Sequence, residues 1–168
     1  RVNVQKALGD NVQQYPAEYP TLFDAIQCAV AEDTVKVESS VMIDDPLTLH
    51  DRGIKFFGGY SADYMTRDLE HAPTVITGHI AESTLRFQGD VGNDTEVDGF
   101  RITGGGGVVF GGIPYFGRYG GGIMLNSNSP TLRNLVITGN SVGDDLNLGC
   151  GGGIMVNGSS PVLENVSI

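Results

Sequence analysis

Tryptophan is absent from this sequence of 168 residues, and basic residues are few, with ten Lys and Arg against twenty Asp and Glu. The net charge is −10, and the basic residues do not cluster. Because nucleic acids and anionic membrane surfaces attract clustered positive charge, neither is an expected partner. No run of ~18 apolar residues occurs, so no segment is expected to insert directly into a membrane.

Glycine is abundant instead, with 25 residues, and many of them lie in an internal repeat. The segment 120–137 returns 31 residues later as 151–168, and eleven of the eighteen positions are identical. A more distant copy relates 97–104 to 132–139. A repeat of this kind is typical of stacked units, because one unit cannot bury its apolar face alone.

Short runs of alternating apolar residues predict strands separated by turns. Within the repeat the alternation is broken once per copy, at Gly99, Asn134 and Asn165. Gly and Asn tolerate the left-handed backbone, so we expect a sharp structural bend at each of these positions. The expected strands are 34–38, 41–43, 47–49, 54–57, 75–76, 85–87 and 97–102.

Stacking of such units places equivalent residues above one another, ~4.8 Å apart. Asn134 and Asn165 are then expected to form an amide ladder. Asp98, Arg133 and Glu164 are expected to form an outer column of alternating charge.

One amphipathic helix is expected at about 21–31. Thr21 is a suitable N-cap, and Asp24 stands three residues later as its reciprocal partner. Leu22, Ile26 and Val30 lie four residues apart and give the helix an apolar face. The sequence thus predicts an N-terminal strand, at Arg1–Val4, and a capping helix within 1–33. The stacked turns are expected in 34–168 and are expected to be incomplete at the C-terminal end.

The only cysteines, Cys28 and Cys150, are several layers apart in such a stack. This exceeds the ~7 Å between Cα atoms that a disulfide can span. We expect both to be free thiols, with Cys28 buried, and neither to bind a metal.

One known pattern has a cap helix, a first strand and later turns, and four segments of this sequence follow it: 19–26, 33–37, 57–60 and 73–78. On these segments the whole chain resembles a right-handed parallel β-helix of the pectin-lyase-like superfamily. The Gly-Gly-Gly-Ile and Ile-Thr-Gly-Asn elements are similar to repeats of polymorphic outer-membrane and other bacterial cell-surface β-helix proteins. The resemblance implies an all-β solenoid, a parallel β-helix of about four to five turns with an N-terminal capping α-helix.

Enzymes of this superfamily act on polysaccharides through carboxylates, and the lyases among them hold calcium. None of their motifs is present here, so no catalytic residue is assigned. Asp98 and Glu164, with Arg133 between them, are interpreted as a solvated charge ladder, with a catalytic set as the alternative.

An acidic run contains the calcium candidates Asp90, Asp94 and Asp98, and its later part resembles the start of an EF-hand loop. The twelfth position of that loop is Gly105, where a bidentate Glu is needed, so the motif fails. We expect no metal or other cofactor, with weak calcium binding by this turn as the alternative.

The loop 110–119 gathers four aromatic residues and an arginine. Tyr115, Phe116, Arg118 and Tyr119 are the candidate sugar-binding residues, because aromatic rings beside a polar donor suit a sugar surface. The alternative is that the aromatic rings fold back over the side of the coil.

The expected function is a non-catalytic structural or adhesive β-helix segment of a secreted or cell-surface bacterial protein. Its expected partners are further β-helix turns or another subunit at the open C-terminal end, and possible partners include glycans. A β-helix polysaccharide lyase or glycoside hydrolase, with its site partly outside this chain, is the first alternative. A carbohydrate-binding module is the second.

Overall fold

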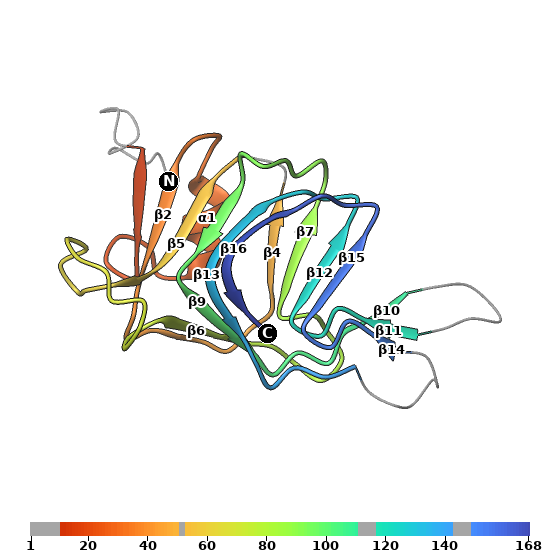
Figure 1. Ribbon diagram of the computed structural model, residues 1–168. Coiled ribbons are helices and arrows are strands. Elements are labelled where there is room, and N and C mark those ends of the chain that lie inside the picture. The colour runs from red at the N-terminus through yellow and green to blue at the C-terminus, as the bar shows by residue number, and fades with distance from the viewer. Residues whose placement is uncertain (1–10, 51–52, 111–116, 143–148) are drawn as a thin grey trace.

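Short parallel strands dominate the structure, a computed structural model that describes residues 11–50, 53–110, 117–142 and 149–168 (Figure 1). The structure is 45% strand, and the residues that it describes contain one helix. The alternation of apolar and polar residues explains this content, because such runs bury one face of a strand and expose the other.

The elements follow one another in the chain with short connections. The helix is α1 (Leu22–Cys28). The strands are β1 (Val12–Tyr15), β2 (Thr34–Glu38), β3 (Met42–Ile43), β4 (Leu47–His50), β5 (Lys55–Tyr60), β6 (Thr74–Thr77), β7 (Leu85–Gln88), β8 (Glu96–Asp98), β9 (Phe100–Thr103), β10 (Val108–Phe110), β11 (Gly117–Tyr119), β12 (Ile123–Asn126), β13 (Thr131–Ile137), β14 (Gly149–Cys150), β15 (Ile154–Asn157) and β16 (Val162–Ser167).

Two parallel sheets enclose the core. The larger one has the order β1-β2-β5-β8-β13-β9-β6-β3, with β16 also paired to β13, and the other has the order β15-β12-β7-β4. The first half of β13 pairs with β8 and its second half with β9, so the larger sheet curls at this strand (Figure 1). A mostly β chain with a curled parallel sheet is compatible with the expected all-β solenoid.

The two repeat copies are neighbours in register. Ile123 pairs with Ile154 in one sheet, and Leu132 pairs with Leu163 in the other. Residues 31 positions apart therefore lie side by side, as the repeat predicts.

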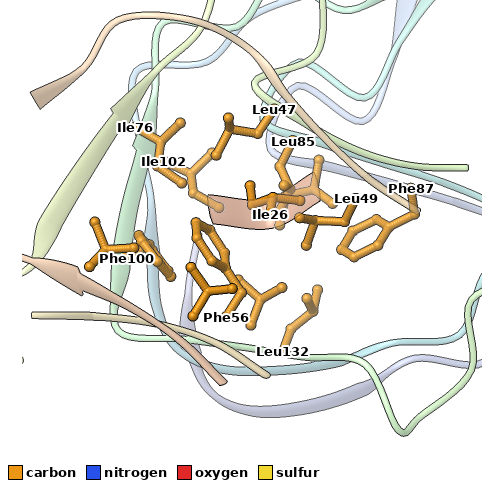
Figure 2. Close-up of a cluster of buried hydrophobic side chains, with 14 of the residues drawn as sticks. Ile26, Leu47, Leu49, Phe56, Ile76, Leu85, Phe87, Phe100, Ile102 and Leu132 are labelled. Atoms are coloured by element: carbon orange, nitrogen blue, oxygen red, sulfur yellow. The ribbon is translucent and has the colours of Figure 1, made fainter. Parts of the chain in front are cut away.

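The core fills the space between the sheets with the inward residues of successive strands (Figure 2). The rings of Phe56 and Phe100 stack with centroids 4.4 Å apart, and both side chains are fully buried. Ile26 of α1 enters the same cluster beside residues of β4 and β7. Each fully buried Leu, Ile or Phe contributes about 1.5–3 kcal/mol, so this cluster is the main source of stability.

The backbone is left-handed at the three interrupted positions of the repeat. The φ angles are 82° at Gly99, 48° at Asn134 and 53° at Asn165. At Gly99 a side chain would also displace the guanidinium of Arg67 and one methyl group of Leu69, so the local packing favours glycine there. These positions turn the chain from one stretch of strand to the next.

Helix α1 is shorter than the expected 21–31. Thr21 is the N-cap, and its hydroxyl oxygen accepts the N–H of Asp24 at 3.1 Å. The helix ends at Cys28 because Ala29 has an extended backbone, with ψ of 142°. Val30 therefore lies outside the helix and its side chain is exposed, which corrects the apolar face expected for it.

The stretch before α1 contains a strand that the sequence did not indicate. β1 pairs in parallel with β2, and its Gln13 is buried and donates to the carboxylate of Asp33 at 3.3 Å. A polar residue in the buried position hides the alternation that would signal a strand. The strand expected at Arg1–Val4 lies outside the described residues. Neither Cys28 nor Cys150 forms a disulfide, and Cys28 is half-buried rather than buried.

Candidate functional site

A row of charged and aromatic side chains runs across the outer face of the larger sheet. Strand register aligns Lys36 with Phe57, Phe57 with Asp98, Asp98 with Arg133, and Arg133 with Glu164. The expected column of Asp98, Arg133 and Glu164 is therefore present in the backbone register, and it extends over two further strands.

The ion pairs along this row differ from the expected alternation. Arg133 places Nη1 2.7 Å from Glu96 Oε1 and Nε 2.8 Å from Glu164 Oε2. Glu164 first and then Glu96 raise the pKa of the Arg133 guanidinium. Asp98 contacts Arg67 instead, with Nη2 3.0 Å from Oδ1. Arg67 belongs to the segment 61–73 between β5 and β6, and its guanidinium binds both the carboxylate and the backbone carbonyl of Asp98.

Arg67 is held in place from several sides. Its Nε donates to Gly58 O at 2.9 Å and its Nη2 donates to Asp98 O at 3.0 Å. Its guanidinium also lies over the rings of Phe57 and Tyr60, 5.2 and 5.3 Å from their centroids. Burial raises the pKa of the Tyr60 hydroxyl, and the positive charge of Arg67 opposes that rise.

Each carboxylate of the row, and that of Glu96 beside it, thus has an arginine partner. Glu96 and Glu164 share Arg133, and Asp98 binds Arg67 and the amide of Asn134. Polysaccharide hydrolysis requires a pair of carboxyl groups that face the substrate, one of them as an acid. The row has instead the arrangement of an ion-pair ladder.

The calcium candidates lie in different environments. Asp90 and Asp94 are exposed in the turn between β7 and β8, whereas Asp98 is buried against Arg67. Within the described ranges, no three His, Cys, Asp or Glu side chains come together as a group that could hold a metal ion.

Of the four candidate sugar-binding residues, two lie within the described residues and two lie outside them. Tyr115 and Phe116 lie outside the described residues. Arg118 and Tyr119 belong to β11, which pairs antiparallel with β10 and parallel with β14. Arg118 Nη1 donates to the carbonyl oxygens of Ile80 and Gly107 at 3.3 and 3.2 Å. Its guanidinium therefore fastens the β10–β11 hairpin to a neighbouring turn.

A groove lies between α1 and the turn that joins β3 to β4. Its volume is about 520 Å³, and the exposed side chains of Phe23 and Met42 line it together with Leu47. Asp44 and Asp45 lie at the same groove and are themselves exposed. Its polar groups are therefore solvated, as in a surface depression and unlike a preorganised site.

The most distinctive surface is the outer side of β15 and β16, which we call the end face. In this last layer Val156, Leu163 and Ile168 are 45%, 47% and 74% exposed. Their counterparts one layer earlier, Leu125, Leu132 and Ile137, are 0%, 0% and 2% exposed. The apolar residues of the end face thus occupy positions that are part of the core one layer earlier, but here they are exposed to solvent.

The backbone of the end face is also open. β15 is the last strand of its sheet, and β16 pairs only with β13 among the described strands. One edge of each strand therefore has peptide groups without a strand partner, and such edges readily pair with other strands. Full burial of a Val, Leu or Ile side chain is worth about 1.5–3 kcal/mol, so covering the end face would recover roughly half of that for Val156 and Leu163 and about three quarters for Ile168.

Two asparagines that fasten the turns were not identified from the sequence. Buried Asn128 donates to Phe87 O at 3.3 Å and accepts from Val91 N at 3.2 Å. Asn140 donates to Ile102 O at 2.9 Å and accepts from Gly105 N at 3.0 Å. Each follows a repeated strand, Asn128 inside the repeat and Asn140 just after it, and this position was the available signal. Arg67 lies in a loop outside the repeat and had no such signal.

The single helix of the described residues is too short and too polar to cross a membrane. Comparison of the chain with family models, with curated proteins and with solved structures gave no match.

Proposed function

We propose that this chain is a structural or adhesive segment of a right-handed parallel β-helix. In this proposal the segment belongs to a secreted or cell-surface bacterial protein, and its end face stacks on a further layer of β-strands. That layer comes from more turns of the same coil or from another subunit.

The observation that carries the proposal is the change in exposure between the last two layers. Leu132 is fully buried, whereas its register partner Leu163 is 47% exposed. The two side chains occupy equivalent positions, but β16 lies beside Leu132, whereas no described strand lies on the outer side of Leu163. A neighbour with the same strand arrangement supplies both the apolar cover and the backbone hydrogen bonds.

The paired carboxylates favour a structural role over a catalytic one. Glu96, Asp98 and Glu164 are all bound to arginine, and Asp98 is also bound to Asn134. The proposed surface location rests on the resemblance of the Gly-Gly-Gly-Ile and Ile-Thr-Gly-Asn elements to repeats of bacterial cell-surface proteins.

Hydrogen exchange tests the proposal directly. One chain is the present sequence, and the other continues after Ile168 with a second copy of residues 138–168, which adds one full repeat. We expect the amides of Val162–Ser167 to exchange much faster than those of Thr131–Ile137 in the first chain. In the extended chain the two strands should be protected to a similar degree.

The proposal fails if the added repeat leaves exchange in β16 unchanged. It also fails if β16 is already as protected as β13 in a dilute monomer of the present chain. Analytical ultracentrifugation of each sample establishes which species is present during the exchange measurement.

A further inference from the structure

A continuous chain of side-chain hydrogen bonds crosses three layers of the larger sheet. Asn165 Nδ2 donates to Asn134 Oδ1 at 2.8 Å, and Asn134 Nδ2 donates to Asp98 Oδ1 at 3.0 Å. Each donor belongs to a later layer than its acceptor, so the ladder has a direction.

The chemistry of Asp98 fixes that direction. An ionised carboxylate only accepts hydrogen bonds, and Asp98 is held in an ion pair by Arg67 at 3.0 Å. Asn134 must therefore present its NH₂ group to Asp98, which leaves its oxygen for Asn165. Asn165 in turn must present its NH₂ group to Asn134. The amide orientation thus follows from an acceptor-only group at the start of the ladder.

The last member of the ladder is left with an open acceptor. Asn165 is exposed at the end face, and its NH₂ group is engaged with Asn134. A second pair runs in the same direction, because Asn157 Nδ2 donates to Asn126 Oδ1 at 2.8 Å. Asn157 is exposed on β15. Both asparagines therefore offer oxygen atoms to whatever covers the end face.

We infer that the end face selects a parallel strand layer that carries side-chain NH₂ donors at the positions following Asn157 and Asn165. A further copy of the repeat, with Asn at both positions, has this chemistry. This inference rests on the proposed function and specifies its partner.

The direction of the ladder disfavours two other arrangements at the end face. A second copy related by a twofold axis that passes beside the ladder brings its own Asn165 oxygen against this one, so two acceptors meet without a proton between them. A layer with Asp at the ladder position places a carboxylate against the Asn165 oxygen, which is also an acceptor pair. A buried acceptor without a donor is costly, so both arrangements are disfavoured.

The test uses the chain extended after Ile168 by a copy of residues 138–168. The added residue equivalent to Asn165 is kept as Asn in one chain and replaced by Gly or by Asp in two others. Gly keeps the left-handed backbone but has neither donor nor acceptor. We expect hydrogen-exchange protection of Val162–Ser167 to follow the order Asn, Gly, Asp, with Asn and Asp separated by about tenfold or more.

The matched control is Asn11→Asp in the Asn-extended chain. Asn11 is exposed before β1, at the opposite end of the sheet order, so it adds the same charge without touching the ladder. Protection of β16 should be unchanged by this control.

The possible failures are distinct. If no extended chain protects β16, the proposed function itself is wrong. If the Asn, Gly and Asp versions protect β16 equally, or if Gly is best, stacking occurs but the ladder does not select the partner. A twofold end-to-end dimer of the present chain that protects β16 also overturns the inference.

Discussion

Asn165 donates its side-chain amide to the oxygen of Asn134 at 2.8 Å, and both residues have left-handed backbone, with φ of 53° and 48°. One residue type therefore serves two purposes at this position. Asn accepts the bend that redirects the strand, and its amide joins consecutive layers. The four predictions that follow separate such roles in the ladder, the loop, the end face and the tyrosine cluster.

The ladder should contribute to stability beyond the backbone conformation. Asn134→Gly keeps the left-handed bend but removes the bonds to Asp98 and Asn165. We expect the free energy of unfolding in urea to fall by about 1–3 kcal/mol, because two polar partners lose a hydrogen bond. Asn134→Leu should cost more, since it adds the strain of left-handed backbone. A Gly variant as stable as the original chain would contradict a stabilising ladder.

Arg67 should contribute to the free energy of unfolding because it balances the charge of a buried carboxylate. Asp98 is 7% exposed, and its ion pair with Arg67 spans 3.0 Å. Arg67→Met leaves this carboxylate without its partner and should lower the free energy of unfolding by about 3 kcal/mol. Replacing Asp98 by Asn in the same chain should restore part of the loss.

The control for Arg67 is Arg86→Met, which removes a more exposed pair with Glu82 at 3.2 Å. An exposed pair is worth about 0–1 kcal/mol, so this variant should change stability little. Equal effects of the two arginine variants in urea unfolding would contradict the special position of Arg67.

The end face should promote association of the purified chain. Leu163→Lys places a charge on the surface where Leu163 is 47% exposed. We expect higher solubility and less concentration-dependent light scattering, with a small change in stability because the side chain is not fully buried. Ile80→Lys is the matched control, since Ile80 is 84% exposed and lies outside the end face. An equal gain in solubility from the control would contradict the prediction.

Tyr60 and Tyr64, whose ring centroids lie 6.4 Å apart and which form the tyrosine cluster, should make the fold sensitive to alkaline pH. Burial raises the pKa of Tyr64 and of Tyr60 above the ordinary value of 10.0. A raised pKa in the folded chain means that the neutral hydroxyl is favoured there. Its contribution is complete below pH ~10 and is lost as pH rises through the folded-state pKa.

Tyr64→Phe should therefore flatten the loss of stability above pH ~10. At neutral pH it should cost a little, because the Tyr64 hydroxyl accepts the N–H of Ala17 at 3.3 Å. The measurement is the urea midpoint from pH 8 to 11.5, compared between the two chains. Parallel curves for both chains across this range would show that Tyr64 does not contribute to the pH dependence.

The strands and the bends of the repeat were accessible from local sequence. The run 34–38 alternates, and β2 spans the same residues, Thr34–Glu38. Two copies in one chain also showed which positions are equivalent, and strand register pairs Leu132 with Leu163. Helix α1 was found at its N-cap but not at its end, because Asp33 accepts the N–H of Val30 at 2.9 Å from beyond the helix.

The contacts of the candidate sites were less accessible. Strand register aligns Asp98 with Arg133, yet Arg67 takes the carboxylate from a loop that the repeat does not include. A residue outside any periodic pattern has no sequence signal for its position in space. Asn128 lies inside the repeat, but its partners Phe87 and Val91 belong to the preceding layer, and residue spacing alone does not name them.

The sequence by itself determined the local alternation, the left-handed positions and the pairing of the repeat copies, since all three depend on residue type and spacing along the chain. Only the tertiary structure decided which partner each charged side chain takes and which apolar residues remain exposed at the end face. Those outcomes depend on neighbours that folding brings together from distant parts of the chain, as Arg67 and Asp98 illustrate.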